Sequence, residues 1–149
     1  MGILCLSHVL SPIGWVMDTD SVQGYFLSRP EATLDFPFGP DVYVYKVCGR
    51  MFATLGWSDG QPRINLKCDP EQAVFLRETF ASVVPGYHMN KTHWNTVYLD
   101  GSVPSNEIER MIDVSFALVV RKLRRADRQR LEVTHGKEVL YRGLGGALG

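Results

Sequence analysis

Hydrophobic and polar positions in the middle of the chain alternate in a way that predicts β-strands. Residues 42–47 read Val-Tyr-Val-Tyr-Lys-Val and residues 51–57 are again mostly apolar, a composition typical of strands. In residues 63–67, Ile64 and Leu66 alternate with polar residues, which predicts one face on a core and one face in water. The turn signals Cys-Gly-Arg and Ser-Asp-Gly between these segments predict consecutive antiparallel hairpins.

Helix signals flank the strand-rich region. A first helix begins at Asp18 and is stopped by Pro30. A second has Asp69 as its N-cap, bonding through its side chain, and Pro70 at the first helical position. This second helix is expected to end near Ser82.

A longer helix is predicted over residues 105–123, where an apolar stripe at helical spacing would cover the sheet. Shorter strands are predicted at residues 32–36, 87–89 and 95–99. The end of the chain is expected to form a hairpin that turns at His135.

The order of these elements indicates the fold class. Helix, three or four antiparallel strands, helix, two strands and helix together predict a two-layer α+β sandwich, with the helices packed on one face of the sheet. We divide the chain into an N-terminal extension (1–16), one domain (17–125) and a basic, Gly-rich C-terminal tail (126–149).

The N-terminal extension is apolar but does not have the pattern of a signal peptide. No Lys or Arg precedes Arg29, and Pro12 and Gly14 interrupt the apolar run. The segment is also too short to span a bilayer. It is therefore a docked segment, a disordered extension, or translated sequence upstream of a start at Met17, and we favour the last two.

Composition limits the function classes. The 149 residues contain 16 Lys plus Arg and 16 Asp plus Glu, so a wholly basic nucleic-acid binder is excluded but a local basic face is not. Three scattered cysteines predict neither a disulfide framework nor a structural zinc site. We expect a reduced, cytoplasmic protein, favoured to be a monomer, with no cofactor, no bound metal and no membrane partner.

Residues 85–101 are the richest in useful side chains. Stacking rings, cations and amides in one short span suit phosphates and unstacked bases. The alternative is a polar hairpin that places Trp94 and Tyr98 in the core. The candidate binding residues of this segment are Tyr87, His88, Asn90, Lys91, His93, Trp94 and Asn95.

Two further groups of residues are candidates for anion contacts. The first is expected on the open side of the sheet, and its alternative is an ordinary solvated face; it consists of Lys46, Arg63, Asn65 and Lys67. The second follows the long helix, where basic residues also favour the helix dipole without any ligand. It consists of Arg121, Lys122, Arg124 and Arg125 and extends to Arg130. No nucleophile elbow, P-loop or zinc-protease motif is present, so we predict no catalytic residues and no enzyme.

Three motifs carry a family resemblance. The segments DFPFGPDVYVYKV, INLKCDPE and PGYHMNKTHWNTVYLDG resemble the MmcQ/YjbR family, and the match runs from about Asp18 to Leu123. The resemblance implies a CyaY-like (frataxin-like) α+β fold and DNA binding by a basic and aromatic sheet face. It supplies no catalytic residues.

These observations lead to a first hypothesis and two alternatives. The first is a non-enzymatic nucleic-acid-binding protein whose partner is DNA. The second is a pocket for a small anionic metabolite or a peptide carboxylate, in which Lys67, His88, Lys91 and Asn95 converge. The third is a protein-interaction module that uses the exposed sheet face.

Overall fold

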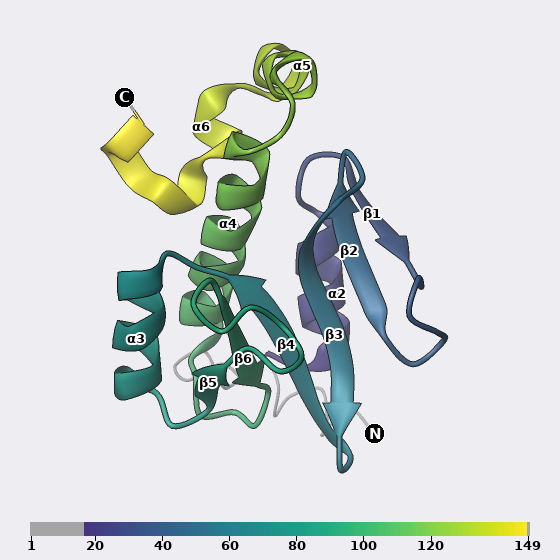
Figure 1. Ribbon diagram of the computed structural model, residues 1–149, viewed down its shortest axis with the longest axis vertical. Coiled ribbons are helices and arrows are strands. Elements are labelled where there is room, and N and C mark those ends of the chain that lie inside the picture. Colours follow the sequence, from purple (N-terminus) through teal and green to yellow (C-terminus); the bar gives the residue numbers. More distant parts are fainter. Residues whose placement is uncertain (1–16, 149) are drawn as a thin grey trace, which may run out of the picture.

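The computed structural model, which describes residues 17–148, contains one six-stranded antiparallel sheet (Figure 1). Its strands lie in the order β1-β2-β3-β4-β6-β5. Their bounds are β1 Ala32–Asp35, β2 Tyr43–Val47, β3 Arg50–Ser58, β4 Gln61–Lys67, β5 Val83–Pro85 and β6 Trp94–Tyr98. The predicted hairpins β2–β3 and β3–β4 are confirmed, with left-handed residues in both turns.

The helices form a second layer. Figure 1 shows α2 and α4 behind the sheet and α3 at the side of β5 and β6. The bounds are α2 Thr19–Leu27, α3 Pro70–Thr79, α4 Ser105–Arg121, α5 Arg125–His135, α6 Lys137–Leu140 and a 3₁₀ segment η1 Arg142–Leu148. The predicted two-layer α+β sandwich is confirmed. Within the described residues, no helix has the length and apolar character needed to cross a bilayer.

The predicted helix starts are confirmed in position. Asp18 caps α2 by accepting a hydrogen bond from the Ser21 backbone at 2.8 Å. Asp69 occupies the N-cap of α3 and is followed by Pro70, but the side chain of Asp69 makes no capping hydrogen bond, so that detail was wrong. The end predicted near Ser82 was also wrong, since α3 ends at Thr79 and the chain is extended from the next residue.

Two strand predictions were wrong. Residues 87–89 lie in the loop between β5 and β6, and the strand of this segment is β5 instead. His88 has a left-handed backbone with φ 58°, which a strand cannot contain. The predicted hairpin at His135 is absent because α5 and α6 occupy that region and meet at Gly136, which has φ 87°. Figure 1 shows this part of the chain beside the end of α4.

The core lies between α4 and the sheet. Phe116 of α4 meets Phe52 of β3 edge to face, with ring centroids 5.2 Å apart. The buried hydroxyl of Ser115 donates to the Phe52 carbonyl at 2.6 Å and accepts from the Lys67 backbone at 2.8 Å. The residues of the C-terminal segment add to the same core, since Leu131 and Leu140 are fully buried. Ser115 thereby fixes the end of β4 against α4.

Helix α5 is tied to the start of β1 through Glu31. Arg130 donates two hydrogen bonds of 3.0 Å to the Glu31 carboxylate, and His135 Nε2 lies 2.8 Å from it. The Arg130 hydrogen bonds, followed by that of His135, lower the pKa of the Glu31 carboxyl from 4.5 to about 2. A depressed carboxyl pKa stabilises the fold above the unfolded-state value, and that stabilisation is lost as the pH falls through the folded-state value.

We therefore expect Glu31→Gln to lower the melting temperature at neutral pH. The difference from wild type should shrink between about pH 4.5 and about pH 2. Thermal melts of both proteins across this range measure it. Glu71→Gln removes an exposed carboxylate of α3 and is the matched control. A difference that persists unchanged down to pH 2 would assign the effect to packing instead of charge.

Candidate functional site

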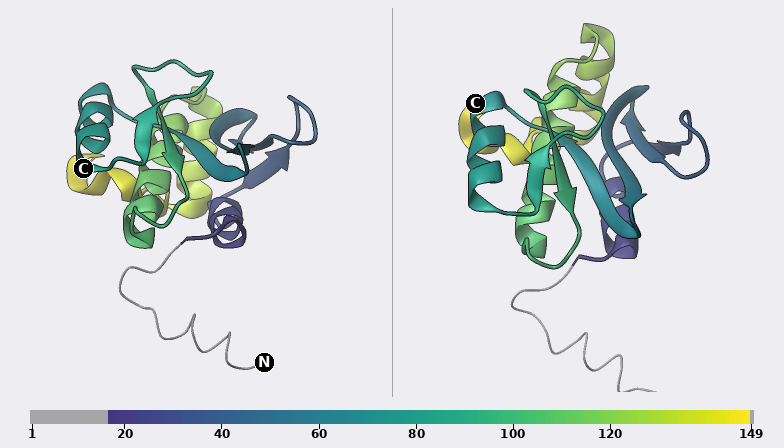
Figure 2. Two further views of the ribbon diagram at one scale, coloured as in Figure 1. Left: turned by 90° about the horizontal axis from the view of Figure 1, so that it is seen from below. Right: turned by 60° about the horizontal axis from the view of Figure 1, so that its bottom comes forward.

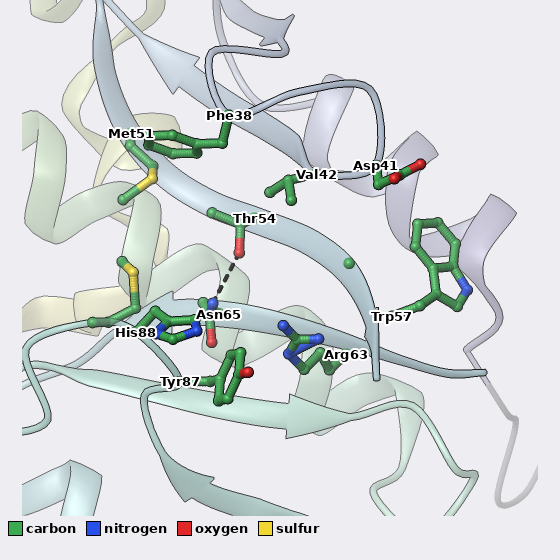
Figure 3. Close-up of a pocket in the computed structure, with 12 residues that line it drawn as sticks. Phe38, Asp41, Val42, Met51, Thr54, Trp57, Arg63, Asn65, Tyr87 and His88 are labelled. Atoms are coloured by element: carbon green, nitrogen blue, oxygen red, sulfur yellow. Dashed lines mark hydrogen bonds between the residues drawn. The ribbon is translucent and has the colours of Figure 1, made fainter. Parts of the chain in front are cut away.

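The sheet face away from α4 is hollowed between two loops. Figure 2 (left) shows the β1–β2 loop and the β5–β6 loop projecting on the side of the sheet opposite α2. A cavity of about 680 Å³ lies here, and we call it the aromatic hollow (Figure 3). Its lining consists of Phe38, Asp41, Val42, Met51, Thr54, Gly56, Trp57, Arg63, Asn65, Tyr87, His88 and Met89.

The floor of the aromatic hollow is a cross-strand row of polar side chains. Thr54, Asn65 and Thr96 face one another on β3, β4 and β6. Asn65 donates to the Thr54 hydroxyl at 3.0 Å, drawn as the dashed line in Figure 3, and accepts a hydrogen bond from Thr96. All three are buried, so the face predicted to be wet at Asn65 is covered. A satisfied buried network of this kind makes a rigid floor.

One wall of the aromatic hollow is built on Tyr87. Its backbone N–H donates to the Thr96 hydroxyl at 2.8 Å, which ties the loop to the floor. The Arg63 guanidinium lies over the Tyr87 ring, 4.4 Å from its centroid. The His88 ring also contacts Tyr87, with the two ring centroids 4.0 Å apart. Arg63 has no ion-pair partner among residues 17–148, and its Nη1 atom is buried without a hydrogen-bond acceptor. The result is a planar, cationic edge on the cavity.

A second hollow of about 580 Å³ lies at the end of β4, and we call it the basic hollow. It brings the end of α4 together with the far side of the β5–β6 loop. Its lining consists of Lys67, Cys68, Asp69, Asn90, His93, Trp94, Leu118, Arg121 and Lys122. Three cations therefore face a single carboxylate, that of Asp69.

Neighbouring cations repel the Lys67 ammonium in the basic hollow. Burial is the largest cause that lowers the pKa of the Lys67 ammonium, and repulsion from Lys122, Arg50 and Arg121 lowers it further. Within residues 17–148, the charged groups of these four side chains have no hydrogen bond or ion pair. Like charges placed close together without ion pairs repel one another, and a bound anion would relieve that repulsion.

Several of the other predicted basic residues are neutralised by acids. Lys46 pairs with Asp35 at 2.8 Å, and Arg124 pairs with Asp127 at 3.3 Å. Farther along α5, Arg128 and Arg130 pair with acids in the same way. Arg125 is exposed at the start of α5 and lines neither hollow. The structure thus brings together Lys67, Arg121 and Lys122 and separates them from the rest of the predicted cluster.

Hydrogen bonds made by Asn90 and Lys91 fix the conformation of the β5–β6 loop. The side-chain amide oxygen of Asn90 accepts a hydrogen bond from the Thr92 backbone N–H at 2.9 Å, which makes an Asx-type turn. The Lys91 ammonium donates to the Gly86 carbonyl at 3.1 Å, and Arg77 of α3 donates to the Lys91 carbonyl. Asn90 and Lys91 therefore hold the loop in the conformation that presents its outer side chains.

Position 86 requires glycine because a side chain there would have no room. A Cβ atom there would lie 2.8 Å from the Trp94 Cβ and 3.0 Å from the Trp94 carbonyl oxygen. We therefore expect Gly86→Ala to displace the loop and cost about 1–3 kcal/mol of stability, the usual cost of overpacking. Urea denaturation of Gly86→Ala measures it, with Gly24→Ala, which has open space, as control. Equal stabilities of the two variants would show that the loop gives way freely.

Asn95 lines neither hollow, and its side chain is bonded to α3. It is 2% exposed, and its amide accepts from Arg77 at 2.7 Å and donates to the Ala73 carbonyl at 3.3 Å. The four residues of the small-ligand alternative do not converge. Lys67 lines the basic hollow, His88 lines the aromatic hollow, and Lys91 is bonded to its own loop.

Several site residues had no strong signal in the sequence. Phe38 and Trp57 are large, exposed aromatics that line the aromatic hollow, and Arg50 adds charge beside Lys67. Phe38 lies in a turn-rich segment outside any strand. A large apolar ring in such a segment is the one sequence feature that indicates an exposed binding residue. Met51 and Thr54 line the aromatic hollow because of their positions along β3, which is fixed by its pairing with β4.

Cys68 is the thiol beside the basic hollow. Burial raises its pKa to about 11, and the nearby Asp69 contributes to the same shift, so the thiolate is disfavoured at neutral pH. In the described part of the chain, no group of three or more His, Cys, Asp or Glu side chains is placed to hold a metal ion.

Fold and site together define an α+β protein with an aromatic hollow on its open sheet face and a basic hollow where the ends of β4 and α4 meet. The YjbR family model matches residues 27–118, and the chain belongs to the YjbR family. The chain is similar to the uncharacterised protein YjbR of Escherichia coli K12. The two are 40% identical over 107 residues, which cover 72% of this chain and 91% of that protein. Protein YbdF of Escherichia coli O157:H7 is 37% identical over 105 residues, covering 70% and 86%.

Two solved structures share the fold. Deinococcus radiodurans protein DR2400 superposes with a TM-score of 0.72 at 34% identity, covering 78% of this chain and 88% of that one. A Pseudomonas syringae protein superposes with a TM-score of 0.61 at 30% identity, covering 68% and 98%.

Proposed function

We propose that the chain is a cytoplasmic, non-enzymatic protein that binds nucleic acid, DNA in particular, through the basic hollow and the sheet face beside it. The observation that carries this proposal is the segregation of unpaired cations. Lys67, Arg121 and Lys122 line one hollow without partners, whereas Lys46 and Arg124 are paired with acids elsewhere.

The segregation matters because the whole chain is neutral, with 16 basic and 16 acidic side chains. A neutral protein has no general attraction for a polyanion, so affinity must come from a local patch. Phosphate contacts by Lys and Arg supply most non-specific nucleic-acid affinity. The three lining cations, with Arg50 close by, form such a patch.

Aromatic rings beside the patch supply the second requirement of nucleic-acid binding. Trp94 and His93 line the basic hollow itself. Tyr87 and Trp57 line the neighbouring hollow and are 46% and 43% exposed. Rings that stack with bases next to cations that hold phosphates are the usual combination in such proteins.

Fluorescence anisotropy with a labelled oligonucleotide tests the proposal. We expect the logarithm of the binding constant to fall linearly with the logarithm of the salt concentration between about 50 and about 200 mM. Three phosphate contacts on a single strand give a slope of about −2. No association at low salt, or association without salt dependence, would refute the proposal.

A second candidate is a small anion, such as phosphate, bound in the basic hollow alone. The convergence of Lys67, Arg121 and Lys122 on one cavity of about 580 Å³ favours it. Inorganic phosphate would then raise the melting temperature in proportion to its occupancy. A rise in melting temperature together with no oligonucleotide binding would select this function over the first.

A further inference from the structure

The aromatic hollow contains aromatic side chains that remain largely exposed. Phe38 is 69% exposed, Tyr87 46% and Trp57 43%, and all three line the same cavity. Large apolar groups gathered at one exposed place indicate a binding surface. In Figure 3 the three side chains stand at different edges of the cavity and leave its centre open.

The polar groups of the hollow suit a ring that carries hydrogen-bond acceptors. The Arg63 guanidinium is stacked over the Tyr87 ring, 4.4 Å from its centroid, and has no ion-pair partner in the described part of the chain. The single acid of the lining is Asp41, and Figure 3 shows its carboxylate turned away from Arg63. A planar ring with carbonyl or ring-nitrogen acceptors could stack here and accept from Arg63 at once.

Strand β4 and the β5–β6 loop each contribute residues to both hollows. Asn65 lines the aromatic hollow and Lys67 lines the basic hollow. Residues two apart in a strand are separated by about 7 Å, a span that one nucleotide covers. The β5–β6 loop lies between the cavities, with residues 87–89 lining one and Asn90 and His93 lining the other.

We propose that the aromatic hollow takes one unstacked base of a single-stranded nucleic acid while a neighbouring phosphate lies in the basic hollow. This inference rests on the proposed function and names its substrate class. Bases within a duplex are paired and stacked, so their faces cannot reach a concave site without being flipped out. A single strand presents its bases freely, and aromatic platforms beside cations are how single strands are held without sequence preference.

The test compares one oligonucleotide, its duplex and the free nucleoside monophosphate by anisotropy or calorimetry. We expect the single strand to bind at least about tenfold more tightly than the duplex. Tyr87→Ala should weaken single-strand binding about tenfold without changing its salt slope, because stacking and phosphate contacts are separate. Tyr87→Phe keeps the ring and should bind like wild type.

The control is Phe75→Ala, which removes a ring of similar exposure, 55%, from α3 outside both hollows. It should leave binding unchanged. Equal affinity for strand and duplex, or an unaffected Tyr87→Ala with salt-dependent binding retained, would overturn this inference and leave the proposed function standing. Binding of the free nucleotide without the oligonucleotide, or of neither, would overturn both.

Discussion

Replacement of Asp113 by alanine is expected to lower the free energy of unfolding by about 3–5 kcal/mol. Asp113 on α4 accepts from Arg29 at 2.9 Å and from the Tyr25 hydroxyl at 2.8 Å, and both charged residues are 9% exposed. Its removal leaves the Arg29 guanidinium buried without a counter-charge, which is the costly state. The contact joins α2 to α4 and so supports the layer beneath the site.

Urea denaturation of Asp113→Ala, Arg29→Met and the double variant measures this effect. The double variant removes both charges, and we expect it to be more stable than the sum of the single losses predicts. A loss below about 1 kcal/mol for Asp113→Ala, as for exposed ion pairs, would show that the pair is screened by water.

Removal of the three cations of the basic hollow is the second large effect. We expect Lys67→Ala, Arg121→Ala and Lys122→Ala together to weaken single-strand binding on the order of tenfold and to reduce the salt slope by about 2. Each charge removed takes away a phosphate contact and the counterion that it releases. Anisotropy titrations across a range of salt concentrations measure both quantities.

A second triple variant makes this prediction specific. Lys46→Ala, Arg110→Ala and Arg128→Ala remove the same total charge from residues that are paired with acids. We expect this control to retain the wild-type salt slope. Equal losses in the two triple variants would mean that overall charge, and not the basic hollow, governs binding.

The sheet could be predicted from the sequence because its signals are local. Alternation at Ile64 and Leu66 and the turn residues around β3 specify hairpins without knowledge of distant residues. The segment after Leu131 was misread because its apolar residues fit a hairpin as well as a helix. The packing of this segment against α4 buries Leu131 and Leu140. That packing favours the helical conformation over the hairpin.

The site could be predicted in part. Residues 85–101 were chosen for their rings, cations and amides, and the pairing of β6 with β4 brings this segment beside Asn65 and Lys67. Which cations are neutralised depends on contacts across the fold, such as that of Arg130 with Glu31, and no local pattern reveals it. The left-handed backbone of His88, which turns the loop over the sheet, likewise has no sequence signal.

The most direct test of the account maps where the oligonucleotide lies. Backbone amide signals of the protein are followed by NMR while a single-stranded oligonucleotide is added. We predict that the largest shifts fall on residues 65–68, on the β5–β6 loop at 86–94 and at the end of α4. Shifts concentrated on α5 or β1, with the two hollows unaffected, would contradict the account.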